Sequence, residues 1–103
     1  MIIYNGIDLP INNTILYFYA NWMPQHKRMM KIINNLPELG YNVIVVDTDS
    51  FKDFAKANSI TCVPTFLFYK NKKKLKTIEG LQMSSVINNE IYNIYLKEPS
   101  EKN

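Results

Sequence analysis

The chain has 103 residues, of which 47% are hydrophobic and 20% charged, and its formal net charge is +3. This length suffices for one domain with one core and is too short for two. No apolar run approaches the roughly 20 residues of a membrane-spanning helix, and the N-terminus lacks the features of a secretory signal. We therefore expect residues 1–103 to form one domain with no membrane partner, and the cytoplasm is its default compartment.

The cysteine content limits the possible chemistry. Cys62 is the only cysteine, which excludes an internal disulfide, a Cys-x-x-Cys redox pair and a multi-cysteine zinc site. Any thiol chemistry needs an external partner. We expect no metal and no cofactor.

The first half of the chain alternates apolar strands with a helix. Residues 2–4 predict a short strand, and the continuously apolar residues 15–19 predict a strand covered on both faces. Pro24 suits the first turn of a helix, and its apolar residues then recur at helical spacing at Met29, Ile32, Ile33 and Leu36. The β-branched residues 41–47 predict a second central strand.

The second half predicts a helix, a hairpin and a last helix. Asp49 or Ser50 can cap the helix, whose inner residues are Phe51, Phe54 and Ala55. Strands at 64–69 and 75–78 flank a polar turn at 71–74. Ser84 or Ser85 can cap the last helix, with Ile87, Ile91, Ile94 and Tyr95 inward. Residues 98–103 are expected to fray.

This order of elements predicts an α/β fold with a mixed sheet. The two strands joined by the first helix should be parallel, and the strands at 64–69 and 75–78 should pair as a hairpin. We expect four to five strands, with helices on both faces of the sheet.

The stretch Ala20–Lys27, "ANWMPQHK", lies where a buried strand passes into a helix. The chain is identified here as a member of the thioredoxin family, because Trp22-Met23-Pro24-Gln25-His26-Lys27 stands in the place of the family's W-C-G-P-C-K. Residues 60–66, "ITCVPTF", resemble the loop that ends in a cis-proline and threonine. Residues 68–72 resemble the family's hairpin, and Glu79-Gly80-Leu81 its glycine before the last helix. The resemblance runs from about Ile15 to Leu96 and implies a thioredoxin fold. The segment 1–14 is short for the family, so the first helix of the family is reduced or absent.

The departures from the family bear on function. Thioredoxins reduce disulfides with two cysteines, the first attacking as a thiolate and the second resolving the mixed disulfide. Met23 and His26 hold these two positions, and neither side chain can perform its step. The family's buried aspartate aligns with Tyr17, and its partner lysine with Val45. The resemblance therefore implies that dithiol oxidoreduction has been lost as a unit.

The resemblance also implies a partner-binding groove, formed by Trp22, Met23, His26, Cys62, Val63, Pro64, Thr65 and Gly80. Trp22 either contacts a partner or packs in the core, and Met23, expected at an exposed helix start, either contacts a partner or only fills a vacated position. His26 is more often structural than functional, as lone histidines are. Cys62, next to an implied cis Val63–Pro64 bond, is a candidate thiol or a small packed residue.

Two further hypotheses are weaker. Met23, His26 and Cys62 could together suit Cu(I), but no spacing signature supports a metal site. Five lysines within Lys70–Lys76 could suggest nucleic-acid binding. This run lacks interleaved aromatic residues and occupies the polar hairpin, so we expect a solvated loop that protects an edge strand, and no nucleic-acid partner.

The sequence favours a redox-inactive, thioredoxin-like module that binds a protein or peptide segment in the cis-proline groove. The alternative is a monothiol protein that acts through mixed disulfides or glutathionylation of Cys62. A structural subunit that docks through a helix and leaves the groove unused is a third hypothesis.

Overall fold

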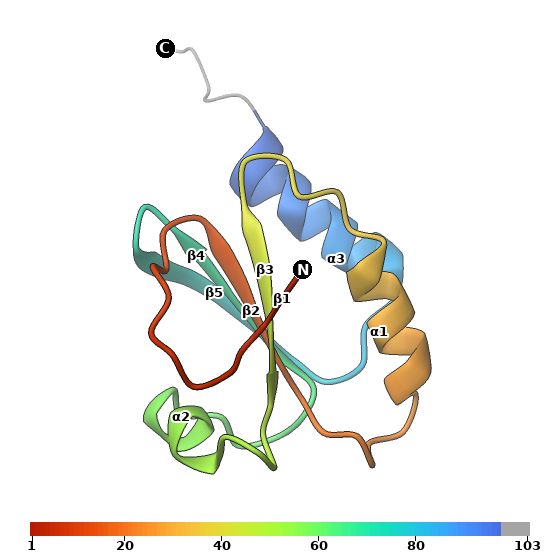
Figure 1. Ribbon diagram of the computed structural model, residues 1–103. Helices are drawn as coiled ribbons and strands as arrows, with labels where there is room; N and C mark the ends of the chain where they lie inside the picture. The colour runs from red at the N-terminus through yellow and green to blue at the C-terminus, as the bar shows by residue number, and fades with distance from the viewer. Residues whose placement is uncertain (98–103) are drawn as a thin grey trace.

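The computed structural model describes residues 1–97, and Figure 1 shows a sheet with helices on both faces. The elements are β1 (Ile2–Ile3), β2 (Thr14–Tyr19), α1 (His26–Asn34), β3 (Asn42–Asp47), α2 (Lys52–Ala57), β4 (Thr65–Lys70), β5 (Lys73–Glu79), α3 (Ser84–Ile91) and the π-helix η1 (Tyr92–Leu96). The five strands lie in the order β1-β3-β2-β4-β5.

The central strand β2 is buried along nearly its whole length. It runs parallel to β3 and antiparallel to β4, and β4 and β5 form an antiparallel hairpin. The predicted parallel pair and the predicted hairpin are therefore confirmed. Burial on both faces explains why residues 15–19 of this strand are apolar at every position instead of alternating.

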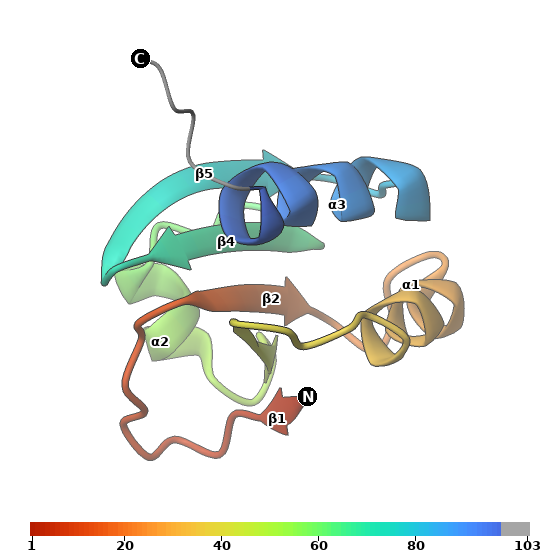
Figure 2. The ribbon, with the colours of Figure 1, turned by 90° about the horizontal axis from the view of Figure 1, so that it is seen from above.

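Alternate residues of the strands build two cores, one on each face of the sheet. Tyr17 and Phe66 pack on the face covered by Met29 of α1 and Ile87 of α3. Leu16, Phe18 and Leu67 pack on the opposite face, where Ala55 of α2 lies. Figures 1 and 2 show α1 and α3 together on one side and α2 on the other.

The N-terminal segment covers the sheet without a helix. The first strand is shorter than predicted and ends at Ile3, although the Tyr4 amide still donates to the Val45 carbonyl at 2.9 Å. Residues 4–13 form no helix. Leu9 and Ile11 pack against the core on the α2 face instead, so this segment supplies apolar cover there.

Two predicted helix starts are wrong. Pro24 lies before α1, which begins at His26 because Gln25 adopts a left-handed conformation with φ of 64°. Neither Asp49 nor Ser50 caps α2, since Phe51 holds the N-cap position and makes no side-chain cap. The backbone amides of Asp49 and Ser50 instead donate to Asp47 Oδ1, at 2.9 and 3.4 Å.

The hairpin and the last helix also differ from the prediction. Asn71 and Lys72 alone form the turn, both with positive φ as in a type I′ hairpin turn, so β5 starts earlier than predicted. Met83 holds the N-cap of α3 and Ser84 is its first residue, without a side-chain cap. The frayed tail predicted for 98–103 lies outside the described residues.

Candidate functional site

The segment between β2 and α1 places Trp22 on the surface. Its side chain is 70% exposed, and its indole Nε1 donates to Asp49 Oδ2 at 2.9 Å. Beside it, Asn21 Nδ2 donates to Asp47 Oδ2 at 3.2 Å. Asp47 and Asp49 thus hold the Asn21–Trp22 turn by hydrogen bonds, and the indole ring remains in contact with solvent. The alternative that Trp22 packs in the core is wrong.

Met23 does not lie on the surface. Its side chain is only 4% exposed and belongs to the core between the sheet and helices α1 and α3. The expectation of an exposed Met23 at the start of the helix is therefore wrong. An unbranched thioether carries no group that needs water, so it can turn inward where a reactive thiol would have to face a substrate.

His26 is half-buried at the first position of α1. Its imidazole stacks on the ring of Tyr19, with centroids 5.2 Å apart and an interplanar angle of 17°. Its Nδ1 atom is buried and has no hydrogen-bond partner among the described residues. The ring contributes packing area at the strand-to-helix junction.

Cys62, Val63, Pro64 and Thr65 form the loop that leads into β4. The Val63–Pro64 peptide bond is cis, and Cys62 is exposed. The buried Thr65 hydroxyl donates to the Cys62 carbonyl at 2.8 Å and lies 3.7 Å from its Sγ. The Gly80 amide donates to the Pro64 carbonyl at 2.8 Å, so the loop is held from both sides.

A cavity of about 230 Å³ lies between Trp22 and this loop, lined by Trp22, Thr48, Ala55, Ile60, Thr61, Cys62 and Val63. The structure thus brings together three of the predicted site residues, Trp22, Cys62 and Val63, and adds Ile60 from the start of the loop. Met23 and His26 do not line this cavity. The sequence analysis did not identify Thr48 and Asp49 as site residues. Their position directly after a central strand was the signal that could have indicated it.

Beneath the site, Tyr17 and Val45 are direct neighbours on the parallel strands β2 and β3. Tyr17 is fully buried, and its hydroxyl has no partner among the described residues. Burial raises the pKa of this hydroxyl above its ordinary value, and the neighbouring Tyr19 raises it further. The Tyr17 hydroxyl therefore stays protonated near neutral pH and cannot act there as a base.

The part of the chain that the structure describes offers neither a metal-binding cluster nor a membrane-spanning helix. Residues 1–97 contain no group of three or more His, Cys, Asp or Glu side chains that could hold a metal ion. None of the helices in the same range is long and apolar enough to cross a membrane.

Comparisons with known proteins agree with this geometry. A thioredoxin from Halobacterium salinarum superposes with a TM-score of 0.77 at 20% identity, covering 86% of this chain and 80% of that one. Thioredoxin-1 of Drosophila yakuba is 27% identical over 77 residues, which are 72% of each protein. The likeness to the solved structure shows the fold alone.

Two longer proteins contain a similar region. A peptide-N(4)-(N-acetyl-beta-glucosaminyl)asparagine amidase of Caenorhabditis briggsae is 32% identical over 91 residues, which are 86% of this chain and 15% of that protein. Monothiol glutaredoxin-S17 of Arabidopsis thaliana is 30% identical over 78 residues, which are 72% of this chain and 16% of that protein. The chain therefore spans about a sixth of the length of these two relatives.

The family profile of thioredoxin matches residues 6–93, which include the three central strands, the Trp22 junction and the loop before β4. With this match and the five-stranded sheet, the chain belongs to the thioredoxin family.

Proposed function

We propose that this chain is a redox-inactive, thioredoxin-like module that binds a protein or peptide segment in the groove between Trp22 and the Cys62–Thr65 loop. One observation carries the proposal: Trp22 is held 70% exposed beside an apolar cavity, while Met23 at the position of the attacking cysteine is buried. In this proposal the groove still binds a partner, whereas residue 23, where the family has its attacking cysteine, does not contact the partner.

The chemistry of the replaced residues supports loss of disulfide reduction. A thioether has no proton to lose and forms no mixed disulfide, and an imidazole does not resolve one. Tyr17, at the position of the family's aspartate, has a phenol whose pKa is raised by burial. Its neighbour Val45, at the position of the family's lysine, has an aliphatic side chain without an ionisable group. Neither side chain can manage the proton of a thiol as the aspartate and lysine of the family do.

The surroundings of the loop support segment binding. Val63 is half-exposed, and its backbone N–H and C=O groups make no hydrogen bond to another described residue. A partner segment in extended conformation can pair with these groups, as in strand-addition modes of peptide recognition. The apolar cavity between Trp22 and Ile60 can then take one side chain of the partner, which would provide an anchor.

The first test is a disulfide-reductase assay. With a protein disulfide such as that of insulin and dithiothreitol as the reductant, the reduction rate is expected to equal that without the protein. A dithiol thioredoxin in the same assay serves as the positive control. A catalysed rate above the background would refute the redox-inactive assignment.

The second test uses variants of the groove on one partner segment, identified by affinity capture and then synthesised. Trp22→Ala is expected to weaken its binding by about 30-fold or more, as loss of a central aromatic anchor does. Leu39→Ala is the matched control, because Leu39 is 66% exposed and lies outside the cavity beside Trp22. Equal affinity for Trp22→Ala and wild type would place the partner elsewhere, as the structural-subunit hypothesis requires.

The variant Cys62→Ser, tested with the same partner segment, distinguishes groove binding from thiol chemistry. Cys62 is exposed, so mixed-disulfide or glutathione chemistry is a specific second candidate. If the groove binds by packing and backbone pairing, Cys62→Ser keeps the affinity. If the protein acts through its thiol, this variant loses the partner and Trp22→Ala retains a covalent complex. The proposal includes a cytoplasmic location, where a single thiol is kept reduced.

A further inference from the structure

The sheet has two edges, and the edge formed by β5 is long and unpaired. β5 is the last strand in the order β1-β3-β2-β4-β5 and spans seven residues, whereas β1 at the other edge spans two. Figure 2 shows β5 at the border of the sheet beside β4. An exposed edge presents unpaired N–H and C=O groups that can pair with another extended chain. The lysines that we expect to protect this edge disfavour only partner strands that do not compensate their charge.

Lysines project from both faces of this edge. Lys76 is paired with Phe68, which packs on the side of α1 and α3, so Lys76 lies on that face. Lys74 is paired with Tyr69, whose ring packs on the opposite core, so Lys74 lies on the other face. Among the described residues, Lys76 has a carboxylate partner in Glu90 at 2.6 Å, and Lys74 has none within ion-pair distance.

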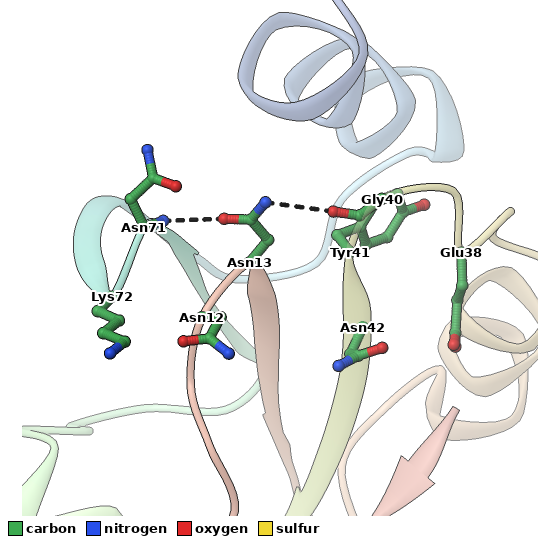
Figure 3. Close-up of a pocket in the computed structure, with 8 residues that line it drawn as sticks. All are labelled: Asn12, Asn13, Glu38, Gly40, Tyr41, Asn42, Asn71 and Lys72. Atoms are coloured by element: carbon green, nitrogen blue, oxygen red, sulfur yellow. Dashed lines mark hydrogen bonds between the residues drawn. The ribbon is translucent and has the colours of Figure 1, made fainter.

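The turn that begins β5 is held in place by an asparagine. Asn13 Oδ1 accepts the Asn71 amide at 2.8 Å, and Asn13 Nδ2 donates to the Gly40 carbonyl at 3.4 Å (Figure 3). The Lys72 amide donates to the Asn12 carbonyl at 3.2 Å. The hairpin end is thus tied to the start of β2 and to the loop before β3, so the lysine-rich strand is ordered before any partner arrives.

We propose that the free edge of β5 binds an acidic extended protein segment, which adds to the sheet as a sixth strand. Successive residues of an added strand point to opposite faces, and lysines stand on both faces. The matching segment therefore carries acidic residues at consecutive positions. Backbone hydrogen bonds fix the register of the added strand, and the lysines favour partners that carry negative charge.

The charges decide against two other occupants. A second copy of this chain that paired β5 with β5 would bring together two strands that each carry three lysines and one glutamate, which is unfavourable. A nucleic acid would find no aromatic side chain between Lys70 and Glu79 on which a base could stack, although it would meet the same positive charge. The unpaired backbone of the edge suits a peptide, which can form hydrogen bonds along the strand.

The experiment measures binding of a fluorescein-labelled peptide that contains a run of glutamates as long as β5. We expect binding to the wild-type protein that weakens at least about tenfold when the salt concentration rises from about 0.05 M to about 0.5 M. Lys73→Gln with Lys74→Gln should weaken it by about tenfold, as the loss of two exposed charge pairs predicts. The matched control is Lys27→Gln with Lys31→Gln. These two exposed lysines lie on α1, away from β5, so their replacement should leave the affinity unchanged.

Two further probes test the strand geometry and the class of partner. A peptide with the same number of glutamates, each separated by proline, should bind much more weakly because proline cannot donate to a strand. Equal binding of this peptide, or equal losses for the two lysine pairs, would overturn strand addition. A single-stranded RNA oligonucleotide that binds more tightly than the glutamate peptide would overturn the acidic-protein assignment. The groove beside Trp22 is not involved, so Trp22→Ala should bind the glutamate peptide as the wild type does.

Discussion

Replacing Tyr17 by aspartate, which restores the carboxyl expected at this position in the family, should destabilise the protein by more than about 4 kcal/mol or prevent folding. Tyr17 is fully buried and packs against Phe66, with ring centroids 4.8 Å apart, and against Tyr19. The substitution removes a ring from the core and leaves a carboxyl group without a partner. Chemical denaturation with urea measures the loss in the free energy of unfolding.

Tyr17→Phe is the matched control for this substitution. The Tyr17 hydroxyl is buried and has no hydrogen-bond partner among the described residues, so its removal should change the free energy of unfolding by less than about 1 kcal/mol. A Tyr17→Asp variant as stable as the wild type would show that this site admits water or charge.

The stability of the protein is expected to fall steeply above about pH 10. Burial raises the pKa of Tyr17, and it also raises the pKa of Tyr95, whose hydroxyl donates to the Tyr69 carbonyl at 2.7 Å. A raised pKa in the folded state means that the unfolded chain ionises first as the pH increases. The stabilisation is fully present below the ordinary tyrosine pKa and is lost as the pH rises from there toward the folded-state values.

Tyr17→Phe should reduce this alkaline loss. A single fully buried tyrosine contributes a slope of up to about 1.4 kcal/mol per pH unit between its unfolded and folded pKa values. The free energy of unfolding, measured in urea from pH 8 to about pH 11, should fall less steeply for the variant than for the wild type. Identical slopes would mean that the Tyr17 hydroxyl ionises in the folded protein as readily as in the unfolded chain.

Local sequence patterns determined most of the fold. The apolar runs within 15–19 and 41–47 are typical of strands covered on both faces, because an exposed face would require alternating polar residues. The helical spacing of Met29, Ile33 and Leu36 likewise defined the inner side of the helix that covers them. The fixed order of short motifs between Ile15 and Leu96 then identified the thioredoxin family.

Some element boundaries could not be predicted because several local choices were equally favourable. Pro24 is compatible both with a helix start and with the turn before one, and the left-handed Gln25 decided for the turn. Asp49 and Ser50 are both good caps, yet the Asp47 carboxylate takes up their amides. Such competition depends on the positions of neighbouring segments, which the sequence does not display.

The exposure of the site residues was decided by tertiary structure alone. Trp22 and Met23 are adjacent apolar residues in the sequence, but the turn directs Met23 into the core and leaves Trp22 on the surface. There Asp49, two residues after β3, accepts the indole hydrogen bond. The sequence by itself determined that the dithiol is absent and which family the chain belongs to, because these follow from residue identity and order. Which side chains face a partner depends on packing between segments far apart in the chain, and only the folded structure contains that information.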